Sequence, residues 1–292
     1  GHAGRRTGRE FQLAPLRHPA AHQNDRTIHV ATYLDDILAA HRRAAADDQR
    51  SLSRLIEQAT AMAPTVSAAD ALTAGDRLAV IAEVKRASPS KGELHANLDP
   101  KRLAATYGEA GAAMVSVLTD EAFFRGSAAD LTAARSGFAG PILRKDFTVS
   151  PADVCDARLM GADVVLLIAA ALDDAELADF AALAAEVGMS ALVEAHDEAE
   201  VERAVEVAGA SLVGVNQRDL VTFKVDTARA VRVAATIPDG VVAIAESGVA
   251  GPADARQLAD AGYHAVLVGE HLVTSADPAA ALSALAVQRR AP

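Results

Sequence analysis

Two side chains of opposite charge lie two residues apart in the stretch IAEVKRASPSKG, residues 81–92. Glu83 and Lys85 fall where a short apolar run, typical of a β-strand, gives way to a Ser-Pro-Ser-Lys-Gly loop. Because side chains alternate between the two faces of a strand, these two point to the same face. A carboxylate and an ammonium group side by side could exchange protons with a substrate or form a simple ion pair at a strand end.

Four further apolar runs end in polar residues of the same kinds. Lys145 follows in LRKDF, Glu194 in LVEAH, Asn216 in GVNQRD and Glu246 in AESG. An ammonium group can donate a proton and a carboxylate can accept one, so this set is typical of general acid–base catalysis. We therefore interpret the six residues as one functional set rather than as unrelated polar residues in solvated loops.

The elements that must position these residues follow one repeated pattern from Leu78 onward. Eight strand-like runs occur at residues 79–84, 113–118, 141–143, 162–168, 190–193, 212–215, 241–245 and 265–268. Stretches of helical period lie between them, for example at residues 100–110, 174–187, 197–208 and 253–261, and several end in a glycine that is typical of a helix C-terminus. The pattern predicts an α/β fold, a (β/α)8 TIM barrel, whose site lies at the carboxyl ends of the strands. An open doubly wound sheet is the alternative, but the loop after the first strand is not a GxGxxG turn.

The N-terminal part predicts two regions. Residues 1–30 are rich in Gly, His, Arg and Pro, and we expect a flexible tail without a catalytic role; a cloning origin for part of it is left open. Residues 31–292 are expected to form a single barrel domain that includes extra helices at about residues 32–48, 51–62 and 67–74.

The loops after the last two strands carry small residues, Ser247-Gly248 and Gly269-Glu270. These two loops of a TIM barrel are frequent phosphate sites, where backbone N–H groups at a helix start can meet an anion. We expect these pairs to begin helices and to face a phosphate, with the Glu270 carboxylate turned away. Structural glycines in tight turns are the alternative.

Composition restricts the partners. The formal net charge of −11 argues against nucleic acid and anionic membranes but permits a phosphorylated small molecule. Cys155 is the one cysteine, expected to pack on a helix, so no internal disulfide is possible and the protein is interpreted as cytoplasmic. We expect no metal site, because no Cys, His, Asp or Glu group has ligand spacing, and we expect a monomer.

Eight motifs in order resemble the indole-3-glycerol-phosphate synthase family of tryptophan biosynthesis. They are IAEVKRASPSKG, SVLTD followed by FFRGS, PILRKDF, GADVVLLIAAAL, LVEAHDE, GVNQRDL, AESGV and AVLVGE. The resemblance extends from about Tyr33 over nearly the whole chain. It implies a carboxy-lyase that closes the pyrrole ring of 1-(2-carboxyphenylamino)-1-deoxyribulose 5-phosphate, releases carbon dioxide and water, and uses no cofactor or metal.

The resemblance also implies roles for the catalytic set. Lys145 would protonate the substrate ketone, and Lys85 would hold the substrate carboxylate and could supply a proton in dehydration. Glu194 would be the general base for dehydration, with Asn216 orienting it or the substrate hydroxyls. Glu83 and Glu246 would hold the sugar hydroxyls and tune the lysines.

Substrate binding is implied for ten further residues. The expected phosphate contacts are Ser88, Ser247, Gly248, Gly269 and Glu270; the expected lining of the anthranilate pocket is Phe124, Phe147, Leu166 and Ile168; Arg218 is a further binding residue.

Three other functions are weighed against this one. Phosphoribosylanthranilate isomerase shares the fold but would use a cysteine base early in the barrel, where this chain has Glu83 and Lys85. A Schiff-base aldolase could use Lys145 as its nucleophile. A non-catalytic phosphosugar-binding barrel would lack one of the paired acids and bases, all of which are present here.

Overall fold

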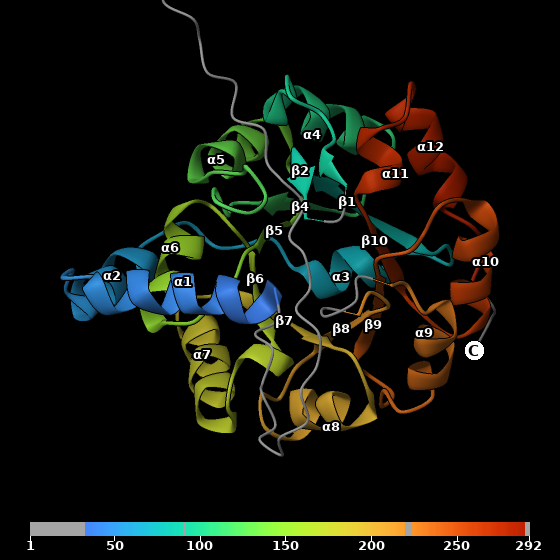
Figure 1. Cartoon of the computed structure of the whole chain (residues 1–292). Coiled ribbons are helices and arrows are strands. Elements are labelled where there is room, and N and C mark those ends of the chain that lie inside the picture. The colour runs from blue at the N-terminus through green and yellow to red at the C-terminus, as the bar shows by residue number, and fades with distance from the viewer. Residues whose placement is uncertain (1–32, 90, 220–223, 290–292) are drawn as a thin grey trace, which may run out of the picture. The chain divides into compact units, whose positions relative to one another are not determined.

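The computed structural model describes residues 33–89, 91–219 and 224–289, and these form a closed barrel of eight parallel strands surrounded by helices (Figure 1). The predicted TIM barrel with additional N-terminal helices is confirmed. The predicted tail, residues 1–30, lies outside the described residues, as do Ser90 and Leu220 of the two motifs quoted above.

The barrel strands alternate with helices along the chain, and each strand pairs in parallel with its neighbours. The strands are β1 (Ala79–Val84), β4 (Met114–Leu118), β5 (Ile142–Lys145), β6 (Val164–Ile168), β7 (Ser190–Ala195), β8 (Leu212–Asn216), β9 (Val242–Glu246) and β10 (Ala265–Val268). Pairing of β1 with both β4 and β10 closes the ring. Two short strands, β2 (Ala87–Ser88) and β3 (Gly92–Glu93), form a small antiparallel pair in the loop after β1.

The helices begin and end close to the predicted boundaries. They are α1 (Tyr33–Asp47), α2 (Leu52–Thr60), α3 (Ala68–Thr73), α4 (Pro100–Glu109), α5 (Ala128–Gly137), α6 (Pro151–Leu159), the 3-10 turn η1 (Ala169–Ala171), α7 (Asp174–Glu186), α8 (Glu198–Glu206), α9 (Thr227–Ala234), α10 (Pro252–Asp260), α11 (Glu270–Val273) and α12 (Pro278–Leu285). None of the helices within the described ranges is long and apolar enough to cross a membrane.

Side-chain and glycine caps explain several of these boundaries. Asp173 accepts a hydrogen bond from the N–H of Glu176 while the Glu176 carboxylate accepts one from the N–H of Asp173, a capping box that starts α7. The glycines after α4 and α6, Gly111 and Gly161, have φ angles of 92° and 97°. Because this left-handed region strains residues that carry a Cβ, the predicted glycine caps are confirmed at these ends.

Two apolar clusters hold the barrel together. One lies between strands and helices and includes Cys155 of α6, which is buried as predicted. The other fills the barrel interior with side chains such as Ile81, Leu143 and Leu192. Leu72 of α3 belongs to this interior cluster and is 1% exposed, because α3 lies against β1, β4 and β9 and closes one end of the barrel.

We predict that Leu72→Ala lowers the free energy of unfolding by about 2–5 kcal/mol, because it opens a cavity in this closed end. Leu52→Ala is the matched control: Leu52 is 40% exposed, so its loss should change stability by less than about 0.5 kcal/mol. Urea unfolding monitored by circular dichroism measures both. Equal effects of the two substitutions would contradict the conclusion that α3 stabilises the barrel by closing its end.

Candidate active site

One cavity of about 540 Å³ opens at the carboxyl ends of the barrel strands. The structure brings all sixteen predicted site residues together around it. They are Glu83, Lys85, Ser88, Phe124, Lys145, Phe147, Leu166, Ile168, Glu194, Asn216, Arg218, Glu246, Ser247, Gly248, Gly269 and Glu270. Their closeness follows from the fold, because parallel strands of a barrel present their carboxyl ends at the same rim.

Lys145, at the end of β5, lies at the centre of the polar part of the cavity. Its Nζ is 2.9 Å from Glu194 Oε2 and 3.4 Å from Glu246 Oε2. Burial alone would lower the pKa of Lys145, but the charges of Glu194, Glu246 and Glu83 outweigh burial and raise it. Lys145 is therefore an ammonium ion.

Glu194, near the end of β7, is the better-satisfied of the two carboxylates beside Lys145. Its Oε2 accepts a hydrogen bond from Lys145, and its Oε1 accepts one from Asn216 Nδ2 at 2.9 Å. Burial would raise the pKa of Glu194, but the charges of Lys145 and His196 and the bond from Asn216 lower it. Glu194 is therefore ionised, although it is only 1% exposed.

Glu246, at the end of β9, has a raised pKa, in contrast to the lowered pKa of Glu194. It is also 1% exposed, and its Oε1 has no hydrogen-bond partner among the described residues. Burial, aided by the charges of Glu194 and Glu83, raises the pKa of Glu246 to about 8 against the opposing charge of Lys145. The contact with Lys145 does not keep Glu246 ionised, because that ammonium lies closer to Glu194.

Glu83 and Lys85 form the second ion pair of the cavity, with Lys85 Nζ 2.6 Å from Glu83 Oε2. Two glycines give these polar groups their room. A Cβ on Gly269 would lie 2.1 Å from Glu83 Oε2 and 2.9 Å from Lys85 Nζ. A Cβ on Gly214 of β8 would lie 2.0 Å from Glu246 Oε1. No side chain larger than hydrogen fits at either position without displacing one of these polar groups.

The apolar end of the cavity is lined by aromatic and branched side chains. The rings of Phe124 and Phe147 lie 6.2 Å apart at an interplanar angle of 38°. Leu166 and Ile168 of β6 complete this end from the strands. A planar aromatic group of a ligand fits against such surfaces.

Sequence reasoning missed the residues that α1 contributes to the cavity. Tyr33, Leu34 and Ile37 line it from this N-terminal helix. Their helical spacing in the sequence shows an apolar face that needs cover. It does not show which surface provides that cover, so the contribution of α1 could not be assigned.

The opposite end carries the predicted phosphate loops, and here one prediction needs correction. Gly269 directly precedes α11, as expected. Ser247 and Gly248 do not begin a helix, because α10 starts at Pro252; instead they adopt left-handed φ angles of 67° and 77° that turn the chain before this helix. The carbonyl of Ser247 is held by Gln217 Nε2 at 2.7 Å.

Three other groups at this end have described surroundings. The Oγ atom of Ser88 is buried and has no hydrogen-bond partner within the described part of the chain. The carboxylate of Glu270 lies 3.5 Å from Lys91 Nζ, a cavity residue that the sequence interpretation did not select. The N–H of Arg218 donates to Asn216 Oδ1 at 3.0 Å, which links this loop to the polar cluster.

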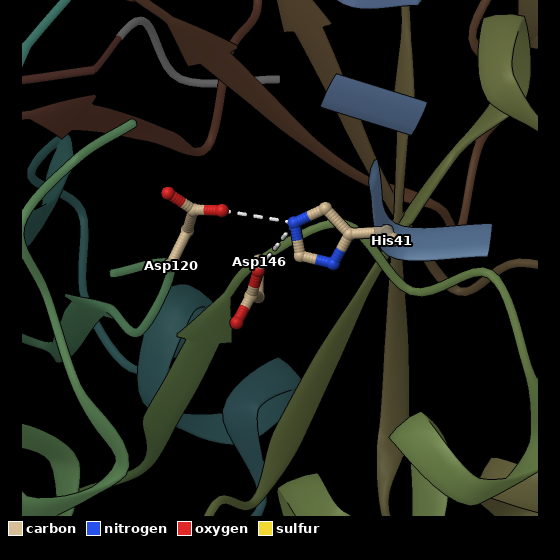
Figure 2. Close-up of side chains that lie close together, drawn as sticks. All are labelled: His41, Asp120 and Asp146. Carbon is tan, nitrogen blue, oxygen red and sulfur yellow. Dashed lines mark hydrogen bonds and ion pairs between the residues drawn. The ribbon is translucent and has the colours of Figure 1, made fainter. Parts of the chain in front are cut away.

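Beside the cavity, His41, Asp120 and Asp146 bring together three donor atoms that lie within 4.8 Å of one another, close enough to surround a metal ion (Figure 2). The sequence could not reveal this cluster, because its members come from α1 and from the ends of β4 and β5. His41 does not line the main cavity.

Comparison with known proteins identifies the family. The model of the family described as indole-3-glycerol phosphate synthase matches residues 34–285. The indole-3-glycerol phosphate synthase of Beutenbergia cavernae is 50% identical over 256 residues, covering 87% of this chain and 94% of that protein. The enzyme of the same name from Mycobacterium bovis is 48% identical over 257 residues, with 87% and 94% covered.

Solved structures of lower identity show the fold alone. Thiamine phosphate pyrophosphorylase from Pyrococcus furiosus superposes with a TM-score of 0.55 at 14% identity, covering 75% of this chain and 96% of that one. A 3-hexulose-6-phosphate synthase gives a TM-score of 0.54 at 18% identity, covering 71% and 98%.

The family model spans most of the chain, and the relatives are about half identical to it over nearly their full length. The family predicted from the motifs is confirmed, and with it the enzyme class, a carboxy-lyase of tryptophan biosynthesis. The chain belongs to the indole-3-glycerol phosphate synthase family.

Proposed function

We propose that this cavity closes the pyrrole ring of 1-(2-carboxyphenylamino)-1-deoxyribulose 5-phosphate and releases carbon dioxide, water and indole-3-glycerol phosphate. One observation carries the proposal: a buried lysine between two carboxylates lies in a cavity with an aromatic end and an end lined by small residues. Such a cavity suits a substrate that has an aromatic ring at one end and a phosphate at the other.

Lys145 acts in the first step. The aryl carbon attacks the ketone carbon, a C–C bond forms, and the ketone oxygen takes a proton from the Lys145 ammonium group. The alkoxide that develops on this oxygen is far more basic than an amine, so it removes a proton even from a lysine with a raised pKa. Until then the positive charge stabilises the developing oxyanion.

Loss of the carboxyl group as carbon dioxide leaves its electron pair in the ring, and rearomatisation drives this step. Glu194 then removes a proton from the carbon next to the ring nitrogen, while the hydroxyl departs as water with a proton from Lys85. Glu194 becomes a stronger base once Lys145 has given up its proton, because the charge that lowers the pKa of Glu194 is then absent. Ring closure forms the hydroxyl that later departs, and the coupling strengthens the base for that later step.

The remaining residues hold the substrate. Phe124, Phe147, Leu166 and Ile168 contact the ring. Asn216, Glu83 and Glu246 orient the hydroxyls and the two lysines, and Arg218 binds nearby. Backbone N–H groups at Ser247, Gly248, Gly269 and Glu270, with the Ser88 hydroxyl, bind the phosphate. The unpartnered Oγ of Ser88 supports this assignment, since a buried hydroxyl needs a partner.

The proposal extends to the oligomeric state and the cellular compartment. We propose that the chain acts as a monomer. We also propose that it acts in the cytoplasm, which the free, buried thiol of Cys155 supports.

Replacing Lys145 by alanine tests the proposed function. We expect kcat for indole-3-glycerol phosphate formation to fall by about 10³-fold or more, because the acid and the main positive charge are lost. Binding of inorganic phosphate should stay within about threefold. The chain has no Trp, so indole fluorescence of the product appears over a low background in buffer with a chelator.

Lys101→Ala is the matched control, since Lys101 is exposed on α4. Near wild-type turnover by Lys145→Ala would show that the acid is misassigned. Absence of indole fluorescence with the unaltered, folded protein would reject the proposed reaction.

Gly269→Ala tests the room that the polar cluster needs. The added Cβ should displace Glu83 and Lys85 by about 1 Å and lower kcat/KM by about 100-fold. Gly251→Ala is the control, because a Cβ there meets nothing within 4 Å in an extended backbone. If both variants keep wild-type kcat/KM in the fluorescence assay, the Glu83–Lys85 geometry does not matter for turnover.

A further inference from the structure

The cluster of His41, Asp120 and Asp146 joins the N-terminal helix to the ends of two barrel strands. His41 extends from α1 toward both carboxylates, as Figure 2 shows. Its Nε2 is 2.9 Å from Asp120 Oδ2 and 3.8 Å from Asp146 Oδ1. Both aspartates are 3% exposed in their side chains, so these contacts are largely removed from water.

Each aspartate in turn accepts hydrogen bonds from the backbone of a phenylalanine at the aromatic end of the cavity. Asp120 Oδ1 accepts hydrogen bonds from the N–H groups of Phe123, at 2.6 Å, and Phe124, at 3.1 Å. Asp146 Oδ1 accepts one from the N–H of Phe147 at 2.8 Å. The orientation of each carboxylate is therefore coupled to the position of a phenylalanine that lines the cavity.

Ring contacts continue the same connection. The His41 imidazole lies 5.5 Å from the Phe147 ring, and Tyr33 at the start of α1 meets Phe123 edge-on at 5.7 Å. Tyr33, Leu34 and Ile37 line the cavity from the same helix. A shift of α1 away from Asp120 and Asp146 would thus alter the aromatic end from two sides.

The charges around His41 favour an imidazolium ion. Burial alone would lower the pKa of His41, but the hydrogen bond to Asp120 and the charges of Asp146, Asp120 and Asp153 of α6 outweigh it and raise the pKa. Arg144, on β5, donates to Asp146 Oδ2 at 2.9 Å and is the cation on the far side of that carboxylate. A protonated imidazole offers no lone pair to a metal, and three of the four carboxylate oxygens already accept hydrogen bonds from neighbouring groups.

We propose that His41 is a positioning residue that fixes the aromatic end of the cavity by bridging Asp120 and Asp146. The proposal rests on the proposed function, because it assigns the aromatic end to the anthranilate ring of the substrate. His41 acts through the two aspartates and their phenylalanines, so its loss should weaken substrate binding more than the chemical step.

His41→Gln tests the proposal. KM should rise about tenfold, since a neutral amide replaces the charged donor between the two carboxylates, while kcat should stay within about threefold. Affinity for the unreactive reduced analogue 1-(2-carboxyphenylamino)-1-deoxyribitol 5-phosphate, measured by calorimetry, should fall about tenfold. Affinity for inorganic phosphate, which probes the opposite end, should not change.

Arg42→Gln is the matched control on the same helix. Arg42 binds Glu176 and the carbonyl of Ala171. Among the described residues, none of its hydrogen bonds reaches the segments that carry Phe124 and Phe147. Its loss should leave KM within about twofold. Equal increases in KM for both variants would show that helix docking alone matters, and no increase for His41→Gln would reject the role.

The pH dependence gives a second readout. With a raised pKa, the imidazolium and its bridge are present at lower pH and are lost as the pH rises through that pKa. The KM of the unaltered chain should therefore rise in the alkaline direction, and the KM of His41→Gln should lack that rise. Identical profiles would contradict the proposal.

Two outcomes separate the remaining explanations. If micromolar Zn²⁺ raises the melting temperature of the unaltered chain but not of His41→Gln, the cluster is a metal site and the bridge is wrong. If the unaltered chain neither turns over the substrate nor binds the analogue, the proposed function fails, whereas normal turnover without an effect of His41→Gln overturns only the role of His41.

Discussion

The active site depends on how two lysines, three buried carboxyl groups and the nearby His196 share their protons. The charges of Glu83, Glu194 and Glu246 all act on Lys145, and Lys85 forms its ion pair with Glu83. Burial disfavours the ionised form of a carboxyl group, and Glu246, which lies farther from Lys145 than Glu194 does, is the group that keeps its proton. The site therefore holds an ammonium ion, an ionised carboxylate and a neutral carboxyl group within hydrogen-bonding reach of one another. Acid–base chemistry at neutral pH needs such a division of proton affinities.

The barrel makes this arrangement possible through its register and its glycines. Ile168 pairs with Glu194 across β6 and β7, and Asn216 pairs with Glu246 across β8 and β9, so the polar residues meet at one level of the rim. Gly214 and Gly269 leave the space into which the carboxylates of Glu246 and Glu83 extend. The apolar cluster in the barrel interior lies directly beneath these charged residues. It keeps water away from that side of the site, and charge interactions are stronger where water is excluded.

Much of this could be predicted from sequence because the information is local. A strand ends where its apolar run ends, and Glu83, Lys145 and Glu246 stand at such points. The remainder depends on contacts between distant parts of the chain. His41 meets Asp120 over 79 positions, and no local pattern marks that pair. The turn at Ser247-Gly248 was wrongly expected to begin a helix, because small residues are compatible with both a helix start and a left-handed turn. The proton on Glu246 likewise follows from its burial and from its surroundings in the folded chain, which no local pattern shows.

The protonation state of Glu246 can be measured directly. Chains with ¹³C-labelled glutamate carboxyl groups, titrated by NMR as the unaltered form and as Glu246→Gln, would resolve it. We expect one carboxyl signal to remain protonated at pH 7 and to titrate near pH 8, and we expect Glu246→Gln to lack this signal. Stability should accordingly fall as the pH rises from the ordinary glutamate pKa toward that value, since the unfolded chain loses this proton first. If every glutamate is ionised by pH 6, the buried charges are balanced in another way and the division of roles among Lys145, Glu194 and Glu246 is wrong.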